Sequence, residues 1–353
     1  MLSRVNKLEA ALAQTDCDAV LVTNLKNIYY LTSFSGTEAT VFISKNRRIF
    51  LTDSRYTLIA KGVVKGFDII ETRDALSEIA KIIADDKIKT IGFDDEISYH
   101  SFKTLEELFS DYKLTAMTAF IENLRMIKDE GEIATIRKAC QISDQAFLDV
   151  LDFIKPGQTT ELQVMNFLDA RMRQLGASGA SFDFIIASGY RSAMPHGVAS
   201  EKVIQTGETL TMDFGCYYNH YVSDMTRTVH VGHVTDEERE IYDIVLRANK
   251  ALIDQAKAGV SRIDFDRIPR QIINDAGYGA YFTHGIGHGI GLDIHEIPYF
   301  GKSSESIETG MVLTDEPGIY LDGKYGVRIE DDLVITETGC EVLTLAPKEL
   351  IVI

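Results

Sequence analysis

The sequence has few cysteines, no long apolar run and a shortage of basic residues, and each shortage removes a class of protein. Only four cysteines occur among 353 residues, and no two of them form a C-x-x-C pair. A chain of this size with widely separated cysteines is expected to keep free thiols in a reducing cytoplasm, without a disulfide framework. No apolar run approaches the ~18–20 residues that a membrane-spanning helix needs, so no membrane association is expected.

The charge balance is acidic, with 36 Lys and Arg against 53 Asp and Glu and a formal net charge of −17. Such a chain lacks the basic footprint that binding to nucleic acid or to anionic lipid requires, so neither partner is expected. The first nine residues, MLSRVNKLE, have charges spread through them and no apolar core, unlike a secretory signal peptide. We therefore expect a cytoplasmic protein.

The length predicts about two domains, and the pattern of predicted helices and strands changes once along the sequence. Strand-like runs alternate with helical spacing over the first ~120 residues, which is typical of an α/β layer. These β-rich runs lie at 19–22, 40–43, 48–51 and 89–93. From about Asp129, capped helices such as those opening at Thr160 and Thr235 are interspersed with strand-rich hairpins, an α+β pattern. We expect an α/β N-terminal domain at 1–124 and an α+β C-terminal domain at 125–353.

Two β-prone runs flank Tyr218-Asn219 and predict a hairpin that carries two aspartates. A turn centred on that dipeptide places Asp213 directly opposite Asp224, on one side of the ribbon. Opposed like charges destabilise a sheet, by ~3 kcal/mol at ~5 Å and an effective dielectric of ~20. A proton, a basic side chain or a metal ion must offset this repulsion. The structural alternative is a wet hairpin end with two solvated acids.

A second acidic pair is expected in a hairpin around Gly323. Pairing about this glycine places Glu316 opposite Glu330. Because Val327 alternates with Arg328 along the strand, Glu330 points away from the apolar face. Arg328 is also a possible neutralising partner, which would make this pair structural.

Histidine is concentrated in one glycine-rich segment. Three of the eight histidines, His284, His288 and His295, fall within twelve residues. The alternating glycines beside the first two allow other groups to approach closely. His196 is a fourth candidate, in the turn-rich loop 188–197. A lone histidine is usually structural, but three beside glycines, in a chain with two acidic hairpins, favour a chemical site.

Four carboxylates and one neutral imidazole balance the charge of two divalent cations. Such a pair of ions lowers the pKa of a bound water and polarises a carbonyl, which is a template for hydrolysis. An oxygen-rich set with a single imidazole suits Mn²⁺, with Co²⁺ or Zn²⁺ as alternatives. The sequence thus predicts a hydrolytic site with two divalent metal ions, Mn²⁺ foremost.

Five segments together resemble the pita-bread metallopeptidases of the Xaa-Pro branch, which holds prolidase and aminopeptidase P. They are Pro195-His196-Gly197, Asp213-Phe214-Gly215 with Ser223-Asp224-Met225-Thr226-Arg227-Thr228, His284-Gly285-Ile286-Gly287-His288 through His295-Glu296, Glu316-Pro317-Gly318-Ile319-Tyr320, and Gly326-Val327-Arg328-Ile329-Glu330-Asp331. The resemblance covers nearly the whole chain and is specific because all five occur in order. It implies a creatinase-like α/β N-terminal domain, a pita-bread α+β catalytic domain of two pseudo-symmetric halves, and a homodimer.

The resemblance also implies a role for each residue of the site. The metal ligands would be Asp213, Asp224, His288, Glu316 and Glu330, with Asp224 and Glu330 shared by the two ions. Glu316 would in addition carry a proton to the departing proline nitrogen. His295, helped by His196, would stabilise the oxyanion. His284, also counted as catalytic, and Arg328 would line the substrate pocket. The substrates would be short proline-containing peptides, cleaved at the Xaa-Pro bond.

Alternatives remain in two classes. Dipeptidase and aminopeptidase forms of the enzyme differ in whether the site clamps a free carboxylate after proline, for which Arg328 is a candidate. By resemblance, a methionine aminopeptidase usually lacks the N-terminal domain, and creatinase shares the fold without metals. A non-catalytic peptide-binding relative would typically have lost ligands, whereas all five positions are filled here.

Overall fold

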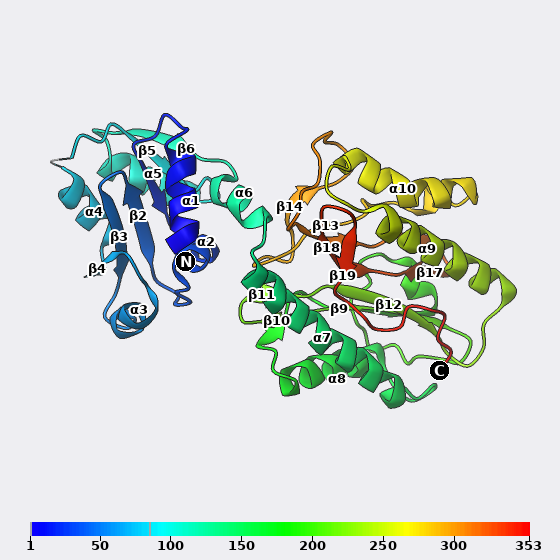
Figure 1. The fold of residues 1–353 in the computed structure, drawn as a ribbon. Coiled ribbons are helices and arrows are strands. Elements are labelled where there is room, and N and C mark those ends of the chain that lie inside the picture. The colour runs from blue at the N-terminus through cyan, green and yellow to red at the C-terminus, as the bar shows by residue number, and fades with distance from the viewer. Residues whose placement is uncertain (1, 85) are drawn as a thin grey trace. The chain divides into compact units, whose positions relative to one another are not determined.

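The computed structural model describes residues 2–84 and 86–353. The chain divides into two compact units, Met1–Arg125 and Met126–Ile353 (Figure 1). The first unit alternates strands with helices, and the second intersperses helices with antiparallel sheets, so the expected α/β and α+β patterns are confirmed. None of the described helices combines the length and apolarity needed to span a membrane. The four cysteines are free thiols, as expected.

The first unit is built on a six-stranded mixed sheet in the order β4-β3-β2-β1-β5-β6. Its strands are β1 (Ala19–Val22), β2 (Thr40–Ser44), β3 (Arg47–Thr52), β4 (Asp68–Glu71), β5 (Thr90–Phe93) and β6 (Lys113–Ala116). Its helices are α1 (Leu2–Leu12), α2 (Leu25–Thr32), α3 (Thr57–Val63), α4 (Ala75–Ile83), α5 (Tyr99–Leu108) and α6 (Phe120–Met126). The central strands β1, β2 and β3 pair antiparallel, and the outer pairs are parallel. The four strand runs expected from the sequence correspond to β1, β2, β3 and β5.

The second unit combines long helices with small antiparallel sheets. Its helices are α7 (Glu130–Phe153), α8 (Glu161–Gln174), α9 (Asp236–Gln255) and α10 (Arg262–Asp275), with short 3₁₀ helices η1 (Gly189–Ala193) and η2 (Gly279–Tyr281). Its first strands are β7 (Gly179–Ala180), β8 (Ile185–Ser188), β9 (Thr209–Phe214), β10 (Cys216–Tyr218), β11 (Tyr221–Val222) and β12 (Met225–His230). The later strands are β13 (His288–Gly289), β14 (Glu296–Tyr299), β15 (Val312–Asp315), β16 (Gly318–Leu321), β17 (Tyr325–Arg328), β18 (Asp331–Ile335) and β19 (Cys340–Val342).

The starts of α8 and α9 have the chemistry that the sequence predicts. Thr160 and Thr235 each accept a hydrogen bond from the backbone N–H three residues later, and the Gln or Glu at that position bonds back to the backbone N–H of the threonine. These reciprocal bonds satisfy backbone donors that the first helical turn leaves without partners. The two capping boxes therefore fix where these helices begin.

The second unit consists of two halves, each with its own core and one acidic hairpin. In one half, α7 and α8 share a buried core with β8, β9 and β12. In the other, α9 and α10 share a core with β15, β16, β17 and β18. The strands lie between the two helix pairs, which places both hairpins at the centre of the unit (Figure 1). This arrangement accounts for the recurrence of an acidic hairpin in the sequence.

The predicted register of the first hairpin is wrong by two residues. The turn is centred on Asn219 and His220, which have φ values of 45° and 71°, and not on Tyr218-Asn219. Two consecutive residues with positive φ form the tight turn that matches the twist of a hairpin. Asp213 consequently pairs with Thr226, and not with Asp224. Because a shift of two residues preserves the face of a strand, both aspartates still lie on the same side of the ribbon.

The predicted register of the second hairpin is confirmed. Gly318 pairs with Arg328 in the β16–β17 ladder, and Asp315 pairs with Asp331 in the β15–β18 ladder. Both pairs have the register set by a turn around Gly323. Glu316 and Glu330 lie between these two ladders, at the point where the strands pass from one sheet to the next.

Candidate active site

All of the side chains singled out in the sequence line one cavity of about 550 Å³ in the second unit. They are His196, Asp213, Asp224, His284, His288, His295, Glu316, Arg328 and Glu330. Apolar side chains, including Phe182, Ile185 and Phe300, line the same cavity. A space of this volume with apolar walls and a few convergent polar groups is typical of a small-molecule or peptide site.

Four acids reach the cavity from the ends of strands. Asp213 is on β9, Asp224 immediately precedes β12, Glu316 follows β15, and Glu330 immediately precedes β18. Burial raises the pKa of all four carboxyls, well above the usual range for Asp224 and Glu330 and to about 7 for Glu316. The negative charges of Glu330 and Asp213 raise the pKa of Asp224 further. Such a cluster is stable with all carboxyls ionised only when cations neutralise it.

Two of these acids have an oxygen that is buried without a hydrogen-bond partner among the described residues. They are Oδ1 of Asp213 and Oδ1 of Asp224. A buried carboxylate oxygen without a donor is costly, and a bound cation is one way to satisfy it. The donor set therefore fits divalent cations.

His288 presents its free ring nitrogen to the acids. Its Nδ1 lies 3.1 Å from the carbonyl oxygen of Gly289, which only accepts, so Nδ1 carries the proton. Nε2 is 3.6 Å from Oε1 of Glu316 and 3.8 Å from Oδ2 of Asp224. Burial and the neighbouring His295 lower the pKa of His288 to about 4, which keeps the ring neutral. A neutral imidazole oriented by a carbonyl is the form in which histidine binds metals.

Ligand atoms of three residues already lie close enough for one ion. One atom each from Asp224, His288 and Glu330 falls within 4.8 Å of the others, and all three residues are buried. A carboxylate pair with an imidazole suits Mn²⁺, Co²⁺ or Zn²⁺ in charge and donor type.

The glycines beside His288 allow the backbone of neighbouring strands to approach it. A Cβ on Gly287, whose φ is +154°, would lie 2.4 Å from the carbonyl oxygen of Thr314. A Cβ on Gly289 would lie 2.5 Å from the carbonyl oxygen of Ile297. Side chains at either position would separate the strands and withdraw His288 from the acids. The close approach expected from the sequence is confirmed for these two glycines.

Arg328 is buried and forms an ion pair with Asp213, and not with either glutamate of its own hairpin. Its Nη2 donates to Oδ2 of Asp213 at 2.6 Å, and its Nε donates to Oγ1 of Thr226 at 3.0 Å. Nη1 donates to the hydroxyl of Tyr320 at 2.7 Å and to the carbonyl oxygen of Pro195 at 3.2 Å. Of the five guanidinium N–H groups, only one on Nη2 has no acceptor among the described residues. Two parallel bonds to a substrate carboxylate are therefore not available in this arrangement.

The other three histidines surround the acids. His284 is held by the hydroxyl of Tyr320, 2.8 Å from Nε2, and by the carbonyl of Gly285, 2.8 Å from Nδ1. Burial, with the charge of Arg328, lowers the pKa of His284 to about 4. The ring of His295 packs edge-on against His288 with centroids 4.3 Å apart. His196 and His295 are both exposed at the cavity, so their rings are accessible to a ligand.

Two residues that support the site were not singled out by sequence reasoning. Thr226 donates a hydrogen bond from Oγ1 to Oε2 of Glu330 at 2.6 Å, and Tyr320 links Arg328 to His284. Strand alternation offers a signal for Thr226, because it lies two residues after Asp224 and so on the same face. No comparable signal identifies Tyr320.

A cavity lined by buried acids and a neutral histidine, in a two-half α+β unit, defines a metal-dependent hydrolase. Comparisons with known proteins agree. A family model described as metallopeptidase family M24 matches residues 134–337, and one described as the creatinase/prolidase N-terminal domain matches residues 4–127. The chain therefore belongs to metallopeptidase family M24. The expected creatinase-like N-terminal domain and pita-bread catalytic domain are confirmed.

Three relatives illustrate the similarity. The structure of an Xaa-Pro dipeptidase from Bacillus anthracis has a TM-score of 0.97 at 43% identity, covering 100% of this chain and 99% of that one. An X-Pro aminopeptidase from Thermotoga maritima has a TM-score of 0.91 at 40% identity, covering 98% and 100%. An Xaa-Pro dipeptidase from Pyrococcus furiosus is 37% identical over 99% of this chain and 100% of its own. The names of the relatives thus include both a dipeptidase and an aminopeptidase.

Proposed function

We propose that the protein is a metal-dependent peptidase that hydrolyses the Xaa-Pro bond at the N-terminus of dipeptides or short peptides. The observation that carries the proposal is the convergence of Asp213, Asp224, His288, Glu316 and Glu330 on one cavity. Relatives with coverage of nearly the whole chain are named for the same bond.

These five residues would hold two divalent cations, Mn²⁺ foremost, with Asp224 and Glu330 shared between them. When bound, the ions would lower the pKa of water and polarise the scissile carbonyl. Among the described residues, Oδ1 of Asp213 and Oδ1 of Asp224 are buried without a hydrogen-bond partner, which supports this assignment. Nε2 of His288 supports it too, because it lies 3.6 Å from Oε1 of Glu316 and 3.8 Å from Oδ2 of Asp224.

Glu316 is proposed to move the proton. Its carboxylate lines the cavity, with Oε1 3.6 Å from Nε2 of His288, where it can meet an attacking water. It would take a proton from the attacking water as the oxygen bonds to the carbonyl carbon. It would then deliver that proton to the proline nitrogen as the C–N bond breaks.

The histidines are proposed to bind and orient the substrate. His295 and His196, exposed at the cavity, would donate to the carbonyl oxygen as it gains negative charge. His284 would line the pocket beside Tyr320. An Xaa-Pro amide has no N–H, so the enzyme must hold such a peptide by its carbonyl, its amino terminus and the pyrrolidine ring. The apolar wall that includes Phe182 and Phe300 suits the ring.

Hydrolysis of Ala-Pro, Ala-Pro-Ala and Ala-Ala by the Mn²⁺-loaded protein tests this function. Cleavage of one or both proline peptides, with Ala-Ala much slower, is the expected result. Cleavage of Ala-Pro alone would assign a dipeptidase, and equal or faster cleavage of Ala-Pro-Ala would assign an aminopeptidase. Preference for methionyl peptides without proline would overturn the proposal in favour of a methionine aminopeptidase. Peptide binding without hydrolysis or metal uptake would identify a binding protein.

A homodimer in the cytoplasm completes the proposal. The free thiols of the four cysteines suit a reducing compartment. Light scattering of the purified protein would measure the oligomeric state.

A further inference from the structure

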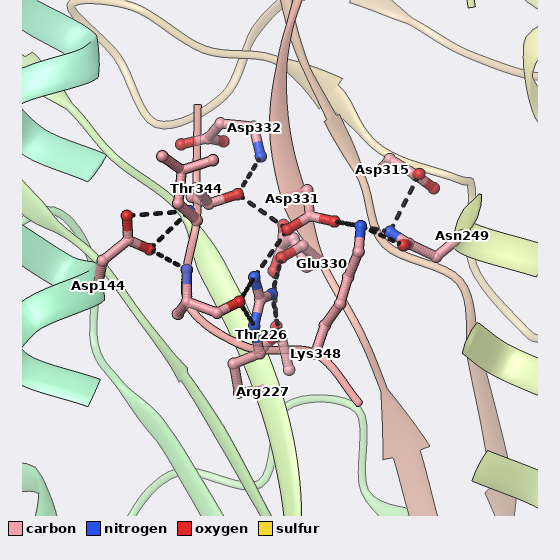
Figure 2. A network of polar contacts seen from close by, with 12 residues as sticks. Asp144, Thr226, Arg227, Asn249, Asp315, Glu330, Asp331, Asp332, Thr344 and Lys348 are labelled. Carbon is pink, nitrogen blue, oxygen red and sulfur yellow. Dashed lines mark hydrogen bonds and ion pairs between the residues drawn. The ribbon is translucent and has the colours of Figure 1, made fainter. Parts of the chain in front are cut away.

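A second group of charged side chains is buried where β12, the start of β18 and residues 344–348 meet (Figure 2). At its centre, Arg227 is 1% exposed and Asp331 is fully buried. Arg227 follows the acid of one hairpin by three residues, and Asp331 directly follows Glu330 in the other. The group therefore joins the two hairpins, and Arg227 and Asp331 are not among the residues that line the cavity.

Arg227 holds the backbone that carries Glu330. Its Nη1 donates to the carbonyl oxygen of Glu330 at 2.5 Å and to that of Thr226 at 3.0 Å. The Glu330 N–H in turn donates to the Thr226 carbonyl at 3.1 Å. Thr226 Oγ1 donates to Oε2 of Glu330 at 2.6 Å. Backbone and carboxylate of Glu330 are thus both fixed by β12.

Arg227 is itself fixed from behind. Its Nη2 donates to Oδ1 of Asp331 at 2.8 Å and to the carbonyl oxygen of Ala346 at 2.9 Å, and its Nε donates to the same carbonyl at 3.2 Å. Lys348 donates from Nζ to Oδ2 of Asp331 at 2.5 Å, and Asn249 donates to this oxygen at 3.1 Å. The guanidinium plane therefore cannot rotate without breaking several buried hydrogen bonds at once.

We propose that Arg227 is a positioning residue for the metal centre: through the Glu330 carbonyl and Thr226 it sets the direction of the Glu330 carboxylate, with Asp331 and Lys348 as its anchors. This inference rests on the proposed function, because it assumes that Glu330 is a ligand. Mutation of a residue that orients a metal ligand typically weakens metal binding by about 10–100-fold.

The guanidinium geometry, more than the charge, is what the contacts require. Arg227 donates to three carbonyls and a carboxylate, which matches a rigid fork of N–H groups. A lysine at this position keeps the positive charge beside Asp331 but cannot reach all of these acceptors. Arg227→Lys therefore separates positioning from simple neutralisation of the buried acids.

The experiment is calorimetric titration of the metal-free protein with Mn²⁺, for wild type, Arg227→Lys and Arg171→Lys. Arg171→Lys is the matched control, because Arg171 Nε donates to Asp149 at 2.6 Å between α8 and α7, outside the cavity. Because Glu330 is proposed as a ligand of both ions, we expect Arg227→Lys to weaken Mn²⁺ binding at both sites by about 10–100-fold and Arg171→Lys to leave both unchanged. The visible spectrum after Co²⁺ addition gives a second readout, since it reports ligand geometry directly.

Substitutions of Lys348 test whether its ion pair with Asp331 helps to hold Arg227 in place. The Lys348 side chain lies at the edge of the group and is 18% exposed. Lys348→Met should fold and lose roughly tenfold in Mn²⁺ affinity, the lower end of the range for such partners. Lys348→Arg should restore most of that loss. These two variants decide the question if Arg227→Lys does not fold, as judged by circular dichroism.

The possible failures differ. If folded Arg227→Lys binds two Mn²⁺ ions as wild type does, Arg227 only stabilises the fold and the inference is wrong, while the proposed function stands. The same holds if Arg227→Lys is unfolded and Lys348→Met binds normally. If wild type itself takes up no Mn²⁺ or Co²⁺, the proposed function and this inference fail together.

Discussion

Nη2 of Arg328 donates to Oδ2 of Asp213 at 2.6 Å, across the boundary between the two hairpins. This bond leaves Oδ1 of Asp213 as the oxygen without a protein partner within the described residues. Arg328 therefore determines which oxygen of Asp213 can turn to a cation. Arg328 also bonds to Tyr320, which contacts His284, and to Thr226, which donates to Glu330. Through these two residues it helps to orient His284 and Glu330.

Replacement of Arg328 by lysine should lower kcat on Ala-Pro by roughly 10²-fold. Lysine keeps the charge but loses the planar fork, and a displacement of about 1 Å in a supporting residue can cost that much. Steady-state kinetics on Ala-Pro and Ala-Pro-Ala measure it, with Arg137→Lys, an exposed pair with Glu341, as the control. A rise in KM confined to the dipeptide, with kcat unchanged, would instead support Arg328 as a clamp on the substrate carboxylate.

Glu316→Gln should abolish proton transfer while preserving the shape of the cavity. We expect kcat to fall by about 10²–10⁴-fold, the usual contribution of a general acid–base group. Metal content by elemental analysis is measured on the same sample, because Glu316 is also a proposed ligand. Near-normal turnover in a variant that retains its metal would show that another group moves the proton.

Removal of metal should lower the melting temperature as well as abolish hydrolysis. The buried acids then repel one another without counter-ions, and ions that bind only the folded state stabilise it by about 2.7 kcal/mol at a concentration 100 times the dissociation constant. Calorimetric melting after chelation and after return of Mn²⁺ measures the effect, with K⁺ at equal ionic strength as the control. Identical melting temperatures in all three samples would contradict a metal site among these acids.

His230 should make stability decrease in mild acid. The ring is fully buried, and among the described residues neither nitrogen has a hydrogen-bond partner. Burial lowers the pKa below 6.5, and the charges of Glu238 (raising) and Arg239 (lowering) act against each other. As the pH falls below about 6.5, the histidine of the unfolded chain binds a proton that the buried ring in the folded protein does not bind. The free energy of unfolding therefore falls as the pH falls.

Chemical denaturation at about pH 7.5 and about pH 5.5 tests this linkage. His230→Leu should show a smaller loss of stability between the two values than wild type does. His233→Leu removes an exposed histidine nearby in sequence and should keep the wild-type difference. An unchanged difference in His230→Leu would mean that other groups carry the acid sensitivity.

Sequence reasoning identified the strands of the first unit that are buried on both faces. β1, β2 and β5 are buried throughout, as are the last four residues of β3, and such strands read as continuous apolar runs. β4 and β6 have exposed ends and half-buried centres. Without a full apolar run, these two edge strands give no periodic signal, and they were missed.

The two hairpins show how register depends on turn chemistry. Gly323, with φ of +70°, marks its turn clearly, and the pairing of Glu316 and Glu330 followed. In the other hairpin both Asn219 and His220 adopt positive φ, a conformation that few residues other than glycine adopt and that the sequence marks less clearly. The aspartates were therefore assigned to the right face and the wrong partner.

The cavity-lining residues could be selected from the sequence, but their hydrogen-bond partners could not. The sequence predicts Arg328 as a partner for the glutamates of its own hairpin, yet it bonds to Asp213 on the other. For Arg227 the sequence shows only that it is part of a motif. Which acid a buried arginine meets depends on how two hairpins far apart in sequence pack, and alternation along one strand carries no information about that.

The β15–β18 and β16–β17 ladders keep one register, from Asp315–Asp331 to Gly318–Arg328, which makes the length of the loop between β16 and β17 critical. One residue inserted at 322–324 would turn Val327 toward the cavity and drive Glu330 into the apolar interior. Engineering of this enzyme by loop grafting should therefore preserve the number of residues there, whatever their identity.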